Sequence, residues 1–274
     1  IMPLYYLYLA AVFAFAPLPV RLVDLAPGDA ALFVAYLGAV PGAVGHYPGH
    51  LLAPLWSVGV EEHFYLVWPL VMRGRNAPSI LRACIVGAVV AVLARAASLA
   101  VLDPDAAGIL TPCRLDALLA GAVLAVVAST RGEIEVTRWC RARVWYALAW
   151  LVVVALTPLG PWSHHGVYPS RAYLVLGYTV TSVACAVSVG SVAHGAPPVA
   201  WLRVRPLVFV GRVSYGVYLL HMAVGAVLYH VASRWRGEAM EAWIVAWVVV
   251  TVAVAAVVHR VVETPFQRLR RHLP

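Results

Sequence analysis

Residues 56–69 read WSVGVEEHFYLVWP and place two adjacent carboxylates, Glu61 and Glu62, inside a segment that is otherwise mostly apolar. His63 and Tyr65 follow in the same segment. Ionisable side chains are costly within an apolar membrane segment, so they are rare there and mark functional sites. The segment therefore predicts a helix that carries chemistry as well as crossing a membrane.

The composition around this segment is that of a polytopic membrane protein. Of the 274 residues, 63% are hydrophobic and 12% charged, which is more apolar material than one water-soluble core holds. The apolar runs are continuous and do not alternate with a period of two, so they indicate helices and not a barrel. We therefore expect an all-α fold, a polytopic transmembrane helical bundle.

Eight segments are long enough to span a bilayer as helices. They are residues 2–20, 55–72, 80–102, 114–130, 144–160, 172–192, 208–230 and 242–262. A ninth apolar piece, residues 30–44, is shorter and rich in glycine, and Pro41 with Gly42 interrupts it. We expect this piece to be re-entrant or interfacial, within a single membrane domain that has no separate soluble domain.

The positive charge is entirely arginine, and it gathers in every second connection between the apolar runs. The arginine-rich connections hold Arg73, Arg75 and Arg82, then Arg131, Arg138, Arg141 and Arg143, then Arg203, Arg205 and Arg212, then Arg268, Arg270 and Arg271. The positive-inside rule places these connections and the C-terminus in the cytoplasm. The pattern predicts topology and gives no sign of nucleic-acid binding.

No metal site is expected from the cysteine and histidine spacing. The four cysteines are dispersed, and they fit buried apolar positions better than a ligand set. The adjacent His164 and His165 cannot converge on one ion, and no third ligand is near them in the sequence.

Polar side chains from separate predicted spans reach a common depth. With a rise of about 1.5 Å per residue, Glu62, His63 and His221 lie roughly 13–16 Å from the nearest cytoplasmic arginine, and Arg95 lies roughly 20 Å from one. Two helices also present polar stripes with i, i+4, i+7 spacing. The stripes are Glu61, Tyr65 and Trp68 on one helix, and Ser214, Tyr218 and His221 on another. They predict a hydrated cavity, either a transport pathway or a buried active site.

The same polar residues also have structural interpretations. Glu61 and Glu62 can neutralise Arg95 inside the bundle. Arg114 and Asp116, which open a later helix, either pair with each other or bind an acceptor. His221 is equally compatible with a hydrogen-bonded core histidine, whose neutral form is favoured by an apolar setting.

Five blocks of the sequence resemble the acyltransferase 3 family, the integral-membrane enzymes that acylate cell-envelope sugars, nodulation factors and macrolides. The blocks are MPLYY at residues 2–6, the stretch at residues 56–69, RLDALLAG at residues 114–121, GRVSYGVYLLH at residues 211–221 and ETPF at residues 263–266. Their order and spacing cover the whole chain. His63 is a departure, because glutamine is usual at that position.

The resemblance implies an enzyme that transfers an acyl group, such as acetyl, from acyl-coenzyme A to a hydroxyl of a carbohydrate or polyketide acceptor. It implies residence among the lipids of a bacterial inner (plasma) membrane and no permanently bound cofactor. The family's catalytic histidine and its coenzyme-binding arginine pair both correspond to positions before Ile1. The resemblance therefore implies that the chain lacks the first two helices of the family plan and is inactive alone.

Roles for the site residues follow from this resemblance. The predicted catalytic residues are Glu61, Glu62, Tyr65 and His221, with the carboxylates orienting or polarising a histidine base. The predicted substrate-binding residues are Trp56, Ser57, His63, Arg95, Arg114, Asp116, Ser214 and Tyr218. Arg73, Arg75 and Arg212 are predicted to bind the coenzyme phosphates, although each also fits a purely topogenic role.

Two other functions are compatible with the residues. A secondary transporter would use Glu61, Glu62, Arg95 and His221 as a relay, but it predicts inverted halves with broken helices, and the sequence shows no internal symmetry. A non-catalytic membrane scaffold is the second, if the upstream segment is absent from the natural protein.

Overall fold

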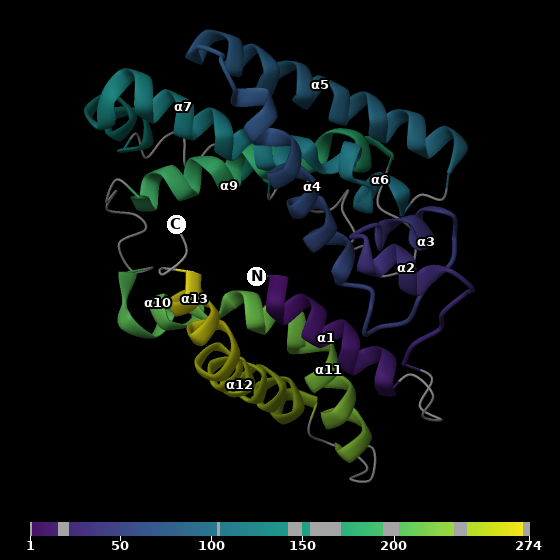
Figure 1. Ribbon diagram of the computed structural model, residues 1–274. Helices are drawn as coiled ribbons and strands as arrows, with labels where there is room; N and C mark the ends of the chain where they lie inside the picture. The colour runs from purple at the N-terminus through teal and green to yellow at the C-terminus, as the bar shows by residue number, and fades with distance from the viewer. Residues whose placement is uncertain are drawn as a thin grey trace. The chain divides into compact units, whose positions relative to one another are not determined.

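The structure, a computed structural model, describes residues 2–15, 22–102, 105–141, 150–153, 171–193, 203–232 and 240–270. Within these residues every regular element is a helix, which confirms the all-α prediction (Figure 1). The chain divides into two compact units. The terminal unit contains residues 1–35, 47–55 and 204–274, and the central unit contains residues 36–46 and 56–203. The assignment of the chain to one membrane domain stays a prediction.

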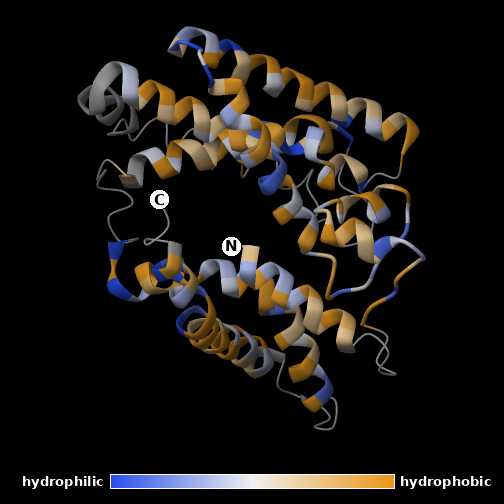
Figure 2. Cartoon of the chain, in the orientation of Figure 1, coloured by the Kyte–Doolittle hydropathy of each residue, from blue (hydrophilic) through white to orange (hydrophobic). Residues whose placement is uncertain are grey.

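Helices of membrane-spanning length account for most of the described chain. Five are long and apolar enough to cross a bilayer: Ala77–Val101, Ala106–Thr130, Tyr173–Gly190, Ser214–Val231 and Ala242–Leu269. Figure 2 shows hydrophobic residues along these helices. They correspond to five of the eight predicted spans, so a polytopic helical architecture is confirmed and the count of eight is not.

The remaining predicted spans have different outcomes. Helix α1 covers Met2–Phe15 and is 14 residues long, and α4 covers Leu55–Met72, which coincides with the predicted span but is less apolar than the other five. The predicted span at residues 144–160 lies outside the described residues except for 150–153. The residue 30–44 piece forms two short helices, α2 (Asp29–Val34) and α3 (Ala39–Ala43), each too short to cross a bilayer.

The central unit is built on three long helices that pack in sequence. Helix α5 (Ala77–Val101) packs on α7 (Thr111–Arg141), and α7 packs on α9 (Tyr178–Ala193) (Figure 1). The one-turn helix α6 (Ala106–Ile109) connects α5 to α7, and a π-helical turn, η2 (Tyr173–Gly177), leads into α9. These helices carry the arginine network described below.

Small residues bring α5 and α7 close together. Cys84 and Ala91 are buried on α5 at one helical repeat from Gly87. A Cβ atom on Gly87 would lie 2.5 Å from Leu119 Cδ1 of α7, so a larger residue there would require the Leu119 side chain to move. Interfaces of this kind are typical of membrane helices, whose association depends on close packing. At the start of α5, the Asn76 side chain caps the helix by accepting a hydrogen bond from the Ser79 backbone N–H.

In the terminal unit, α1 is tied to the following segment by tyrosine hydroxyls. Tyr5 donates to Phe33 O at 2.7 Å, Tyr6 to Val34 O at 3.2 Å, and Tyr8 to Leu51 O at 2.8 Å. These bonds connect α1 to backbone carbonyls at the end of α2 and in the loop before α4.

The rest of the terminal unit is built around the packing of α11 (Ser214–Ala232) on α12 (Met240–Val258). Helix α12 continues through a π-helical turn, η4 (His259–Glu263), into α13 (Thr264–Arg270). The predicted span at residues 208–230 is interrupted, because α10 (Arg205–Arg212) ends at Arg212 and α11 begins only at Ser214. Helix α10 buries no side chain, whereas Val213 at the break is buried.

Candidate functional site

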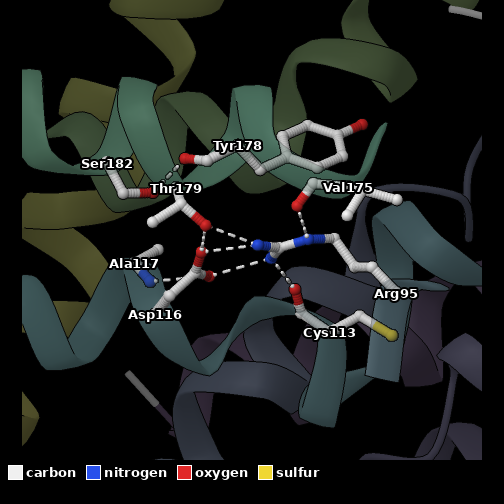
Figure 3. A network of polar contacts seen from close by, with 8 residues as sticks. All are labelled: Arg95, Cys113, Asp116, Ala117, Val175, Tyr178, Thr179 and Ser182. Carbon is white, nitrogen blue, oxygen red and sulfur yellow. Dashed lines mark hydrogen bonds and ion pairs between the residues drawn. The ribbon is translucent and has the colours of Figure 1, made fainter. Parts of the chain in front are cut away.

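Arg95 lies at the centre of the α5, α7 and α9 packing, with an exposed fraction of 0%. Its guanidinium forms a two-bond ion pair with Asp116 of α7, with Nη1 to Oδ1 at 3.2 Å and Nη2 to Oδ2 at 2.9 Å (Figure 3). Arg95 Nη1 also donates to Cys113 O at 2.5 Å, and Nε to Val175 O at 2.9 Å. Thr179 Oγ1 accepts from Nη2 at 2.5 Å, so all five donors of the guanidinium are used.

This network corrects two interpretations of the sequence. The interpretation that Arg95 is neutralised by Glu61 and Glu62 is wrong, because Asp116 supplies its carboxylate. The pairing of Asp116 with Arg114 is wrong for the same reason. Because Arg95 and Asp116 satisfy each other inside the protein, their contacts favour a positioning role, and their predicted contact with a substrate stays a prediction.

Arg114 is instead held by aromatic rings from two other helices. Its Cζ atom lies 4.4 Å from the ring centroid of Tyr178 on α9 and 5.6 Å from that of Trp56 on α4. Both distances are within the range of cation–π attraction. Gly108 adjoins the clamp, since a Cβ atom there would lie 3.2 Å from the Tyr178 hydroxyl. We call Trp56, Arg114 and Tyr178 the arginine clamp.

The ionisable residues of α4 lie farther along the same helix as Trp56. Glu61, Glu62 and His63 are all half-buried. His63 Nδ1 lies 2.7 Å from Thr111 Oγ1, the first residue of α7, so the imidazole is hydrogen-bonded across to the helix that carries Arg114. Tyr65 is 51% exposed, which places it on the outer side of the described central unit.

The start of α4 is fixed by a close backbone approach. A Cβ atom on Gly59 would lie 2.2 Å from the backbone oxygen of Tyr36, so only glycine fits there. Ser57 is half-buried in the same turn. Farther along, Phe64 stacks on Trp68 with ring centroids 5.1 Å apart, so part of the predicted Glu61, Tyr65, Trp68 stripe is occupied by aromatic packing.

The second predicted stripe lies on α11 in the terminal unit. His221 Nδ1 lies 2.5 Å from Tyr218 O, and its ring stacks on Trp247 of α12 with centroids 6.4 Å apart. Trp247 Nε1 donates to His221 O at 2.7 Å, and the Tyr218 hydroxyl donates to Pro54 O at 2.9 Å. Ser214 is exposed. Glu62 and His221 belong to different units, so the cavity they were expected to share stays a prediction.

The predicted coenzyme-binding arginines are exposed. Arg73 and Arg75 follow the last residue of α4, and Arg75 Nη1 donates to Val71 O at 2.6 Å. Arg212 is the last residue of α10 and is also exposed. Figure 2 shows hydrophilic residues at both places, in the connection before α5 and at α10. Among the described residues, no three histidine, cysteine or acidic side chains gather in a way that could hold a metal ion. His164 and His165 lie outside the described residues.

Sequence reasoning missed several residues of these networks. Thr111, Tyr178 and Thr179 belong to no motif, and only the packing of α4, α7 and α9 reveals them. His259 Nδ1 and Glu263 Oε2 form a side-chain hydrogen bond of 2.8 Å within the π-helical turn η4. Their i, i+4 spacing is a signal that could have identified this pair from the sequence.

The family pattern described as an acyltransferase domain matches residues 1–259 of the 274. The chain belongs to the acyltransferase 3 family. No curated protein and no solved structure matches it. Membership makes the chain an acyltransferase that moves groups other than amino-acyl groups, and the five apolar helices of spanning length agree with an integral membrane protein.

Proposed function

We propose that this acyltransferase moves an acyl group, such as acetyl, from acyl-coenzyme A to a hydroxyl of a carbohydrate or related acceptor. The observation that carries the proposal is the distribution of charged residues along α4. Half-buried Glu61 and Glu62 lie near its middle, exposed Arg73 and Arg75 follow its last residue, and the arginine clamp lies at its start. The helix thus connects a cationic end, an acidic centre and an aromatic end.

The chemistry requires a base, a bound thioester and polar groups that stabilise the oxyanion. The acceptor oxygen attacks the thioester carbonyl, forming the ester C–O bond, and the C–S bond breaks to release the thiol of coenzyme A. The base takes the hydroxyl proton and returns it to the departing sulfur. We assign Glu62, supported by Glu61, to orienting the family's catalytic histidine, which acts as the base, as a carboxylate does in hydrolytic triads.

The exposed arginines fit the donor. Coenzyme A carries several phosphates, and a guanidinium binds a phosphate through two parallel hydrogen bonds. Arg73 and Arg75 are two residues apart and exposed, so both can reach one diphosphate. Arg212 at the end of α10 is a further candidate in the terminal unit. The secondary transporter is not favoured, because the family is one of acyl transfer.

The proposal is tested with the whole natural protein in proteoliposomes. Acetyl-coenzyme A is supplied with an envelope polysaccharide fraction, free thiol release is followed over time, and the acetyl ester is detected by mass spectrometry. Glu62→Gln is expected to abolish acceptor-dependent thiol release while leaving the thermal midpoint unchanged. Asp24→Asn, which alters an exposed carboxylate in the loop before α2, is the matched control. Thiol release that does not require a hydroxyl acceptor would overturn the proposal.

A further inference from the structure

Arg114 differs from Arg95 in having no anionic partner in the described part of the chain. Among the described residues, no carboxylate lies within ion-pair distance of Arg114, and its guanidinium makes no hydrogen bond. The side chain is nevertheless half-buried. A guanidinium carries five N–H donors, and a partly desolvated cation whose donors are unused is unfavourable until an acceptor binds.

We propose that the arginine clamp binds an oxyanion, a phosphate or carboxylate group, of the acceptor. The inference rests on the proposed function and adds to it the charge class of the acceptor. Tyr178 and Trp56 attract the cation through their ring faces without supplying an acceptor for its N–H groups. The N–H donors of the planar guanidinium therefore remain available for two parallel hydrogen bonds to one oxyanion.

The buried network explains why Asp116 does not pair with Arg114. Asp116 is the carboxylate nearest to Arg114 in the sequence, but it accepts from Arg95 through both oxygens and from the Thr179 hydroxyl at 2.5 Å. Thr179 also follows Tyr178 directly on α9. The hydrogen bonds of the network thus occupy the Asp116 carboxylate, which does not pair with Arg114. They also fix the position of the backbone that carries the Tyr178 ring.

The position of the clamp on α4 favours the acceptor over the donor as the source of the anion. Trp56 is the second residue of α4, and Arg73 follows the last residue, so the two lie about 26 Å apart along the helix axis. That separation approaches the roughly 30 Å thickness of a bilayer core. If Arg73 and Arg75 hold the coenzyme at one face of the membrane, the clamp faces the opposite side, where an acceptor would enter.

The test measures binding directly and so does not depend on turnover. The whole natural protein in lipid nanodiscs is titrated with methyl glucuronide, glucose 6-phosphate, methyl glucoside and coenzyme A, and apparent affinity is taken from the rise of the thermal midpoint. Methyl glucoside is the neutral match of methyl glucuronide. At least one of the two anionic sugars is expected to bind about 10-fold more tightly than the glucoside, because charge-assisted hydrogen bonds are the stronger kind.

The variants assign that preference to the clamp. Arg114→Gln is expected to weaken binding of the anionic sugar about 10-fold to 100-fold and to leave coenzyme A binding unchanged. Tyr178→Phe, which keeps the ring, should bind normally, whereas Tyr178→Leu should bind more weakly. Arg171→Gln removes an exposed arginine of the same unit as a control for overall charge. The thermal midpoint of each variant without ligand shows whether the variant is folded. Arg114→Lys is a milder change, because it keeps the positive charge and loses the planar guanidinium.

Three results would overturn the inference. The first is equal binding of both anionic sugars and the neutral glucoside. The second is a loss of coenzyme A affinity in Arg114→Gln with anionic sugar binding intact, which would assign the clamp to the donor. The third is an equal loss in Arg171→Gln. Failure of the proposed function is a separate outcome: Arg114-dependent sugar binding without acceptor-dependent thiol release.

Discussion

Arg95 and Asp116 form a two-bond ion pair between α5 and α7, with both side chains buried. Removing one partner of a buried pair leaves the other charge uncompensated, which is more damaging than replacing both. Asp116→Asn is therefore expected to lower the free energy of unfolding by about 3–5 kcal/mol. Denaturant unfolding of the purified protein in detergent micelles measures this change.

The matched control for Asp116→Asn replaces both charges at once. The double variant Arg95→Met with Asp116→Leu leaves no buried charge, so it should recover most of the lost stability. It would also disturb the position of Tyr178 through Thr179, so anionic sugar binding should stay weakened. A double variant no more stable than Asp116→Asn would show that packing, and not the unpaired charge, accounts for the cost.

Gly59 makes the closest backbone approach among the described glycines, with the Tyr36 oxygen 2.2 Å from an ideal Cβ position. A backbone oxygen cannot move aside as a flexible side chain can, so Gly59→Ala should force α4 away from residue 36 and destabilise the protein by about 1–3 kcal/mol. Gly121→Ala on α7 is the control, because nothing lies within 4 Å of its Cβ position. The control should be neutral or slightly stabilising, since alanine favours helix. Thermal midpoints in the same detergent compare the two.

Much of the helical architecture could be predicted from the sequence, because long continuous apolar runs admit only helices in a membrane. The helices α5, α7, α9, α11 and α12 all follow from this argument. The predicted span at residues 208–230 ran through the break at Val213, although Gly211, Arg212 and Ser214 interrupt the apolar run there. Hydropathy gives the extent of an apolar segment and does not show where tertiary packing ends a helix.

The ion pair shows why the site was predicted only in part. The residue spacing predicts how deep Arg95 lies in the membrane. It does not predict the direction in which the side chain points or which helix lies opposite. The sequence allowed Asp116 either to pair with its neighbour Arg114 or to bind an acceptor, whereas the packing of α5 on α7 brings it to Arg95. No sequence pattern indicated a role for Thr111 or Thr179, because the role of a hydroxyl group is recognised only when its hydrogen-bond partner is placed beside it.

Arg73 and Arg75 are expected to act on the donor alone. Because both side chains are exposed, each contact with a coenzyme phosphate is screened by water and contributes about 0.2–1 kcal/mol, as surface ion pairs do. The double variant Arg73→Gln, Arg75→Gln should raise the KM for acetyl-coenzyme A about 2-fold to 30-fold, with the KM for the acceptor unchanged. Arg82→Gln, an exposed arginine on α5, is the control. A larger effect on the KM for the acceptor than on the KM for acetyl-coenzyme A would show that Arg73 and Arg75 do not bind the donor. An unchanged KM for acetyl-coenzyme A at both high and low salt would show the same.

A substitution at His221 distinguishes a catalytic role of this residue from a structural one. Its ring stacks on Trp247, and phenylalanine would keep that contact while losing the imidazole nitrogens. If His221 takes part in proton transfer, His221→Phe should lower kcat about 100-fold or more with little change in the thermal midpoint. If it is a core histidine, the main effect should be a loss of about 1 kcal/mol of stability from the hydrogen bond to Tyr218 O, with kcat preserved.

The control is His230→Phe, which makes the same substitution at an exposed position of the same helix. We expect the first result, because Ser214 and Tyr218 lie on the same face of α11 and both side chains are exposed at that face.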